Sequence, residues 1–143
     1  MSVKQISVFL ENKKGRLAEV TGTLEREGVN MRALSLADTA DFGVLRIIVD
    51  EVDRCLRVLK TAGFVAQVTE VVAIEVEDRP GGLHRILQVL DAGGLNVEYL
   101  YAYLLKRKAA AIVICKIDER EKALAVLTKA GIQTISADML KGL

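Results

Sequence analysis

The chain has 143 residues, which is enough for one medium domain or two small domains of about 70 residues each. Apolar residues make up 51% of the chain, so it can bury a core. Its 20 basic and 19 acidic residues leave a net charge of +1, which argues against non-specific binding to nucleic acid or to an anionic membrane, since both need a clustered positive field.

The hydrophobic pattern of residues 1–70 predicts the order strand, helix, strand, strand, helix, strand. The first helix is predicted to follow Gly15 and to end at Gly28, and the second to be capped by Asp53 and to end at Gly63. The predicted strands are residues 6–10, 30–37, 44–49 and a last one from Phe64, and the predicted buried helix positions are Leu17, Val20, Leu24, Cys55, Leu56 and Leu59.

Residues 71–143 predict the same order. Ile74 and Val76 lie in the first strand, and the first helix ends at Gly93-Gly94. The remaining predictions are an apolar helix stripe of Leu83, Ile86, Leu87 and Leu90, strands at 96–104, 109–117 and 132–137, and a helix at 119–130. Residues 64–77 contain no Pro, Gly or Ser, so the last strand of the first half should nearly run into the first strand of the second half.

The two halves are copies of one module. Glu11–Leu34 aligns without a gap on Glu77–Leu100, and shared glycines at shared positions imply shared backbone turns. The identical pairs are Glu11/Glu77, Gly15/Gly81, Leu17/Leu83, Leu24/Leu90, Gly28/Gly94, Asn30/Asn96 and Leu34/Leu100. The repeat predicts an α+β fold of two ferredoxin-like βαββαβ modules, residues 1–70 and 71–143, with antiparallel sheets and helices on one face.

The sheet face without helices is predicted to be covered. A face open to water should be polar. Leu45 and Ile47 point to one face of their predicted strand and Val44 and Ile48 to the other, and all four are apolar. Ile112, Ile114, Val113 and Cys115 show the same pattern. The expected cover is the sibling repeat or a second chain, and we predict a homodimer.

Each repeat has a glycine turn between its first strand and first helix, at residues 12–17 and 78–83. Gly15 and Gly81 allow close approach of a ligand, and free N–H groups at a helix start can hold a carboxylate. Asn12 or Asp78 could accept hydrogen bonds from an ammonium group. Asn30 and Asn96 begin the second strand, which can emerge on the same edge of the module. Together these groups describe a site for an α-amino acid. The alternative is that the glycines only form tight turns and that the asparagines only tolerate a left-handed backbone.

These segments resemble the ACT domains, a family of amino-acid-sensing regulatory modules. The resemblance rests on Ile6–Leu17 with Glu27–Met31, and on Glu77–Leu83 with Gly94–Val97. The usual family form is an apolar strand, then Asn/Asp-x-Pro-Gly-x-Leu, then a helix that ends in Gly-x-Asn-Ile. Lys14 stands where Pro is usual, and Asp78 where Asn is common.

The resemblance implies that ligands sit between paired modules, held by the glycine turn and the two Asn-type positions. The candidate ligand-binding residues are Asn12, Gly15, Arg16, Leu17, Asn30, Asp78, Pro80, Gly81, Gly82, Leu83 and Asn96.

Tyr99, Tyr101 and Tyr103 are predicted to share one strand face, where they could pack in an interface or line a pocket. His84 is expected to be an exposed or capping side chain, and the basic run Lys106–Lys108 to be a solvated hairpin tip. We find no catalytic triad, phosphate-binding loop or metal-ligand spacing, and predict no cofactor.

The sequence therefore predicts a non-catalytic regulatory protein that binds a small amino acid and acts on a partner enzyme. Two alternatives remain: a regulatory subunit of acetolactate synthase, and a structural dimerisation module with degenerate sites. No apolar run is long enough for a signal peptide or a membrane span, and Cys55 and Cys115 are expected to be reduced core residues, so a cytoplasmic location is predicted.

Overall fold

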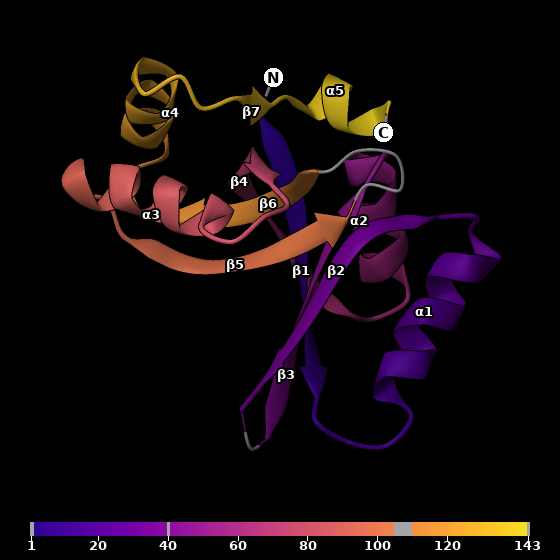
Figure 1. Cartoon of the computed structure of the whole chain (residues 1–143). Helices are drawn as coiled ribbons and strands as arrows, with labels where there is room; N and C mark the ends of the chain where they lie inside the picture. Colours follow the sequence, from indigo (N-terminus) through magenta and orange to yellow (C-terminus); the bar gives the residue numbers. More distant parts are fainter. Residues whose placement is uncertain (1, 40, 105–109, 143) are drawn as a thin grey trace. The chain divides into compact units, whose positions relative to one another are not determined.

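The fold was analysed in a computed structural model that describes residues 2–39, 41–104 and 110–142. The chain divides into two compact units, which we call the first unit (Lys4–Thr69) and the second unit (Glu70–Leu143 with Met1–Val3). Each is a sheet with helices (Figure 1). The elements are β1 (Val3–Glu11), α1 (Arg16–Arg26), β2 (Met31–Asp38), β3 (Phe42–Val49), α2 (Val52–Thr61), β4 (Val65–Glu77), α3 (Gly82–Ala92), β5 (Val97–Leu104), β6 (Ala110–Ile117), α4 (Arg120–Lys129), β7 (Thr134–Ile135) and α5 (Ala137–Lys141).

Both units have the same topology. The strand order is β2-β3-β1-β4 in the first unit and β5-β6-β4-β7 in the second, and the pairs β1–β3, β2–β3, β4–β6, β5–β6 and β4–β7 are antiparallel. The boundary between the units falls inside β4, which begins as the last strand of the first unit and continues as the first strand of the second. The predicted pair of ferredoxin-like βαββαβ modules is confirmed, whereas the boundaries 1–70 and 71–143 stay a prediction.

In each unit two helices pack on one sheet face and form a core with it. In the first unit Val20 and Leu24 of α1 and Leu59 of α2 pack against the strands, and in the second Leu90 of α3 and Leu127 of α4 do the same. All five side chains are nearly inaccessible to solvent. The sheet side chains of these cores are Ile6, Val8, Leu10, Leu45, Ile47 and Val49 in the first unit and Val72, Ile74, Val76, Val113, Cys115 and Ile117 in the second.

Side chains of the opposite parity are buried as well. Ile48 of β3 is 3% exposed, and Ile112 and Ile114 of β6 are fully buried. On β1, Gln5 is buried and its Nε2 donates to the Ser7 hydroxyl at 3.1 Å. Both faces of these strands are therefore low in solvent exposure, as their apolar composition predicted. The homodimer inferred from that composition stays a prediction.

Three local predictions are wrong. Leu17 is 40% exposed because Arg16, four residues before Val20, takes the inward position at the start of α1. Asp53 is not a helix cap, because α2 begins at Val52 and Asp53 lies in its first turn. Its carboxylate there still interacts favourably with the positive end of the helix dipole.

The last strand is the third correction. Residues 132–137 were predicted to form it, but β7 contains only Thr134–Ile135. The helix α5 follows, and its N-cap Ser136 accepts a hydrogen bond from the Met139 N–H at 3.2 Å. A serine before Ala-Asp-Met-Leu-Lys-Gly is a helix-start pattern that the sequence contained.

Candidate functional site

The two glycine turns have the same backbone conformation. Gly15 (φ 89°) precedes α1 and Gly81 (φ 85°) precedes α3, both in the left-handed region that favours glycine. Neither helix start has a side-chain cap. The first intrahelical bonds are donated by Glu19 N–H to Gly15 O and by Arg85 N–H to Gly81 O, each at 3.0 Å. In each helix the two residues just before this donor have N–H groups that make no intrahelical bond, so these groups point out of the helix start.

The turn in the second unit is tighter. Gly82 N–H donates to Arg79 O at 3.0 Å, while its counterpart Arg16 N–H donates to Lys13 O at 3.4 Å. A Cβ atom added at Gly82 would lie 2.2 Å from the backbone oxygen of Glu77. Only glycine fits at Gly82 as the turn now stands.

The predicted site residues fall into two groups at opposite ends of each sheet. In the first unit Glu11, next to Asn12, pairs with Phe42, whereas Met31, next to Asn30, pairs with Val49. The two pairs are separated by seven residues of β3, about 23 Å at the usual strand rise. The expectation that Asn30 emerges on the same edge as its own glycine turn is wrong.

The second unit repeats this separation. Glu77, next to Asp78, pairs with Ala110, while Val97, next to Asn96, pairs with Ile117. Asn96 is held at its end of the sheet by Asp118, whose carboxylate accepts from the Asn96 N–H at 3.0 Å. The turn of each unit and the later asparagine of the same unit therefore cannot contact one small ligand.

Asn12 is close to the β2–β3 hairpin. Its backbone N–H donates to Asp41 O at 2.9 Å, and its side-chain Nδ2 donates to Thr39 O at 3.4 Å. These contacts fix the first glycine turn against the hairpin of the same unit. Its counterpart Asp78 is exposed.

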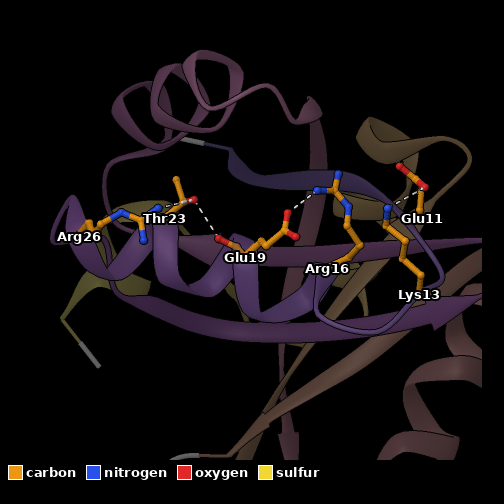
Figure 2. A network of polar contacts seen from close by, with 6 residues as sticks. All are labelled: Glu11, Lys13, Arg16, Glu19, Thr23 and Arg26. Carbon is orange, nitrogen blue, oxygen red and sulfur yellow. Dashed lines mark hydrogen bonds and ion pairs between the residues drawn. The ribbon is translucent and has the colours of Figure 1, made fainter.

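Arg16 lies across the start of α1. Its guanidinium is 5.2 Å from the centre of the Phe64 ring. The same guanidinium pairs with the Glu19 carboxylate, and Figure 2 shows this pair beside the Lys13–Glu11 ion pair. Arg16 Nε is buried and has no hydrogen-bond partner in the part of the chain that the structure describes. The arginine is thus held by its aromatic neighbour and its ion pair.

The second unit has a groove of about 280 Å³ beside its glycine turn. The residues of the turn and of α3 that line it are Pro80, Gly81, Gly82, Arg85 and Ile86, and Ile132 lies opposite them. Glu75, Glu77 and Arg79 add charged groups to the same lining, and Arg79 pairs with Glu77. Three of the predicted site residues are therefore brought together there, and Leu83, partly buried, packs against the core next to them. Arg85 was missed by sequence reasoning, although the repeat contained the signal: it aligns with Glu19, which has the opposite charge.

The prediction that the three tyrosines share one strand face is confirmed. Tyr99, Tyr101 and Tyr103 pair with Lys116, Ile114 and Ile112, and Leu100 and Ala102 pair with residues of the other parity. Tyr101 is buried and the other two are partly buried. The interface or pocket formed by the tyrosines stays a prediction. His84 is exposed, and the basic run Lys106–Lys108 lies outside the described residues.

The two cysteines are free and buried. Burial raises the pKa of the Cys115 thiol to about 12 and that of Cys55 to about 11, the latter against the lowering effect of the nearby Arg54. Within residues 2–39, 41–104 and 110–142 no group of three or more His, Cys, Asp or Glu could hold a metal ion. None of the helices there is long and apolar enough to cross a membrane.

Comparison with known proteins identifies the family. A family model described as the ACT domain pair matches residues 1–143, while no curated protein matches the chain. The crystal structure of protein BT0572 from Bacteroides thetaiotaomicron is 38% identical, with a TM-score of 0.92, and the match covers 100% of this chain and 98% of that one. The ligand-free regulatory subunit of aspartate kinase from Thermus thermophilus is 19% identical (TM-score 0.65, covering 91% and 93%), and its counterpart from Thermus flavus is 16% identical (TM-score 0.63, covering 91% and 93%). Because the model spans the whole chain and the Bacteroides protein is similar over its full length, this chain belongs to the ACT domain pair family.

Proposed function

We propose that this protein is a non-catalytic regulator that binds a small free amino acid at a glycine turn and passes the signal to a partner enzyme. The observation that carries the proposal is the pair of left-handed glycine turns, each opening directly into a helix start without a side-chain cap, in a chain of the ACT domain pair family. Uncapped N–H groups and the positive end of the helix dipole favour the carboxylate of an amino acid.

The separation of the two groups of site residues indicates how such a site would be completed. Asn30 and Asn96 lie at the far end of the sheet from the turn of their own unit. In a two-fold homodimer, the turn end of one module can lie beside the asparagine end of a module in the partner chain when the two-fold axis is perpendicular to the strands, because the two sheets then run in opposite directions. We therefore propose that the site lies between two chains, each contributing one of the two groups.

Regulation follows from such a shared site. A ligand that contacts both sides of an interface stabilises the arrangement in which both contacts form, and it changes the equilibrium only by its difference in affinity between arrangements. The regulatory subunits of aspartate kinase among the similar structures are parts of a metabolic enzyme. A cytoplasmic metabolic enzyme is accordingly the partner that we propose.

A thermal-shift screen of the full chain against the twenty standard amino acids tests ligand binding. A ligand at 100 times its dissociation constant adds about 2.7 kcal/mol of stability, which corresponds to a rise in Tm of roughly 5–10 °C for a chain of this size. At least one amino acid should produce such a rise at millimolar concentration. If none does, the sensor function is refuted and the structural dimerisation module becomes the better account.

Association with other chains needs separate measurements. Sedimentation equilibrium should give a mass of two chains, and that mass should persist to lower protein concentration when the ligand is present. Affinity purification followed by identification of the retained enzyme separates the possible partners: recovery of acetolactate synthase would favour the alternative of a subunit of that enzyme. A monomer with and without ligand would refute the site between chains.

A further inference from the structure

The groove beside the second glycine turn has an equivalent position in the first unit, because the repeat aligns its walls residue by residue. Gly82 aligns with Arg16 and Arg85 with Glu19. Ile132 is the counterpart of Phe64: each follows the helix-terminal glycine and donates its N–H to a leucine oxygen five residues earlier, at 3.0 Å in both units. These three pairs can therefore be compared directly.

In the first unit Arg16 contacts the other two equivalent residues, Phe64 and Glu19. Arg16 lies over the Phe64 ring, with 5.2 Å between the guanidinium and the ring centre. Its guanidinium also pairs with Glu19, as Figure 2 shows. The arginine side chain thus occupies the space between the helix start and the residue after Gly63. Its charge is already neutralised by Glu19, so a ligand carboxylate gains little from it.

In the second unit the corresponding space is open. Gly82 has no side chain, and the 2.2 Å between an added Cβ and the Glu77 oxygen keeps any larger residue out of the present turn. The remaining groove measures about 280 Å³. Pro80, Ile86 and Ile132 form the apolar part of its wall, and Glu75, Glu77 and Arg79 form a polar part. That volume can hold a small amino acid.

The charge on the groove wall is also reversed between the units. Arg85 replaces Glu19, and its guanidinium takes part in none of the ion pairs among the residues that the structure describes. An unpaired guanidinium in the groove wall is suited to a carboxylate, with which it can form a charge-assisted hydrogen bond. The carboxylates of Glu75 and Glu77 in the same wall are suited to an ammonium group, so the two charges of a free amino acid both find an opposite charge there. The apolar part of the wall, formed by Pro80, Ile86 and Ile132, suits an aliphatic side chain.

We propose that only the second repeat has an open ligand groove at its glycine turn, that this groove takes a free amino acid with a small aliphatic side chain, and that Arg16 fills the equivalent space in the first repeat. The inference rests on the proposed amino-acid binding and adds which repeat binds, the class of ligand and the residue that closes the other copy. The two repeats then differ in function: the second binds the amino acid, whereas in the first the side chain of Arg16 fills the equivalent space.

Isothermal titration of the full chain with L-alanine, L-valine, L-leucine, L-isoleucine and L-threonine, each to millimolar concentration, measures both affinity and the number of sites. The wild type should bind at least one of them with one site per chain. Arg85→Gln should weaken that binding roughly tenfold or more, the usual size of a lost charge-assisted hydrogen bond. Arg57→Gln, which removes an exposed arginine of α2, is the matched control and should leave the affinity unchanged.

Two variants test the filled site. Arg16→Gly copies the residue of the second repeat and should raise the number of sites from one to two per chain. Arg16→Leu removes the charge but keeps a side chain over Phe64, so the number should stay at one. Circular dichroism and thermal melts establish that each variant is folded.

Several outcomes overturn the inference while amino-acid binding itself stands. They are two sites per wild-type chain, an unchanged affinity of Arg85→Gln, a single site in Arg16→Gly, or tight binding of charged amino acids alone. If none of the twenty amino acids binds, the proposed function and this inference are both overturned.

Discussion

Replacing Gly82 by alanine tests the tight turn of the second unit. Gly82 is the first residue of α3, where alanine would normally be the better helix former. Here the added methyl group would lie 2.2 Å from the Glu77 backbone oxygen, with Val76 Cγ1 at 3.4 Å on another side. Real Cβ atoms do not approach other atoms closer than 3.0 Å, so the turn must open by about 0.8 Å.

The expected loss of stability follows from that displacement. Forcing extra volume into a packed site costs about 1–3 kcal/mol, and this exceeds the gain of up to about 1 kcal/mol that a helical Gly→Ala change otherwise brings. The natural control is Gly22 in the middle of α1, where an added Cβ would meet only the flexible end of Arg26 at 3.5 Å. Gly22→Ala should therefore stabilise the first unit by roughly 0.5–1 kcal/mol.

Urea unfolding followed by far-UV circular dichroism gives both free energies. If the two units unfold in separate transitions, Gly82→Ala should shift the transition of the second unit to lower urea, and Gly22→Ala that of the first to higher urea. Gly82→Ala with unchanged or increased stability would refute the reasoning, because the turn would then accommodate a side chain at no cost.

Two further predictions concern α5 and the thiols. Ser136→Ala should lower stability by about 1 kcal/mol in urea unfolding, because it removes the bond that the hydroxyl accepts from Met139 N–H; Ser136→Asp, which can also cap, should restore most of it. Cys55 and Cys115 should react with a thiol reagent at pH 8 only after unfolding, since burial raises the pKa of both thiols, and equal labelling rates in native and denatured protein would contradict this. As their pKa values are higher in the folded state than the unfolded value of 9.0, the stability from these thiols is complete below pH 9 and falls as the pH rises towards 11–12; a free energy of unfolding independent of pH between 9 and 11 would show that they do not contribute.

The predictable part of the fold is carried by local patterns. The glycines at 15, 28, 81 and 94 have positive φ and end or begin helices where the repeat placed them. The apolar stripes of α1 to α4 follow helical spacing, so the buried positions Val20, Leu24 and Leu90 could be named in advance. The exception is α5, whose serine cap was present but whose length of five residues leaves no periodic stripe.

The candidate site was only half predictable. Both glycine turns were identified because turn chemistry depends on neighbours in sequence. The position of Asn30 and Asn96 was predicted incorrectly because it depends on strand register: β2 runs back along β3, so its first residue ends at the far edge of the sheet. A helix of eleven residues separates the turn from that strand, and its length of about 16 Å already points to opposite ends.

The sequence by itself determined that this chain is a duplicated module with two glycine turns, since repeats, periodicity and turn residues act over a few positions. The tertiary structure alone decided that Arg16 lies over Phe64 while Gly82 leaves a groove against Ile132. Those contacts join residues about fifty positions apart, and the result depends on whether the residue at the helix start has a side chain long enough to fill the space. Two turns that look equivalent in the sequence are therefore different sites in the folded protein.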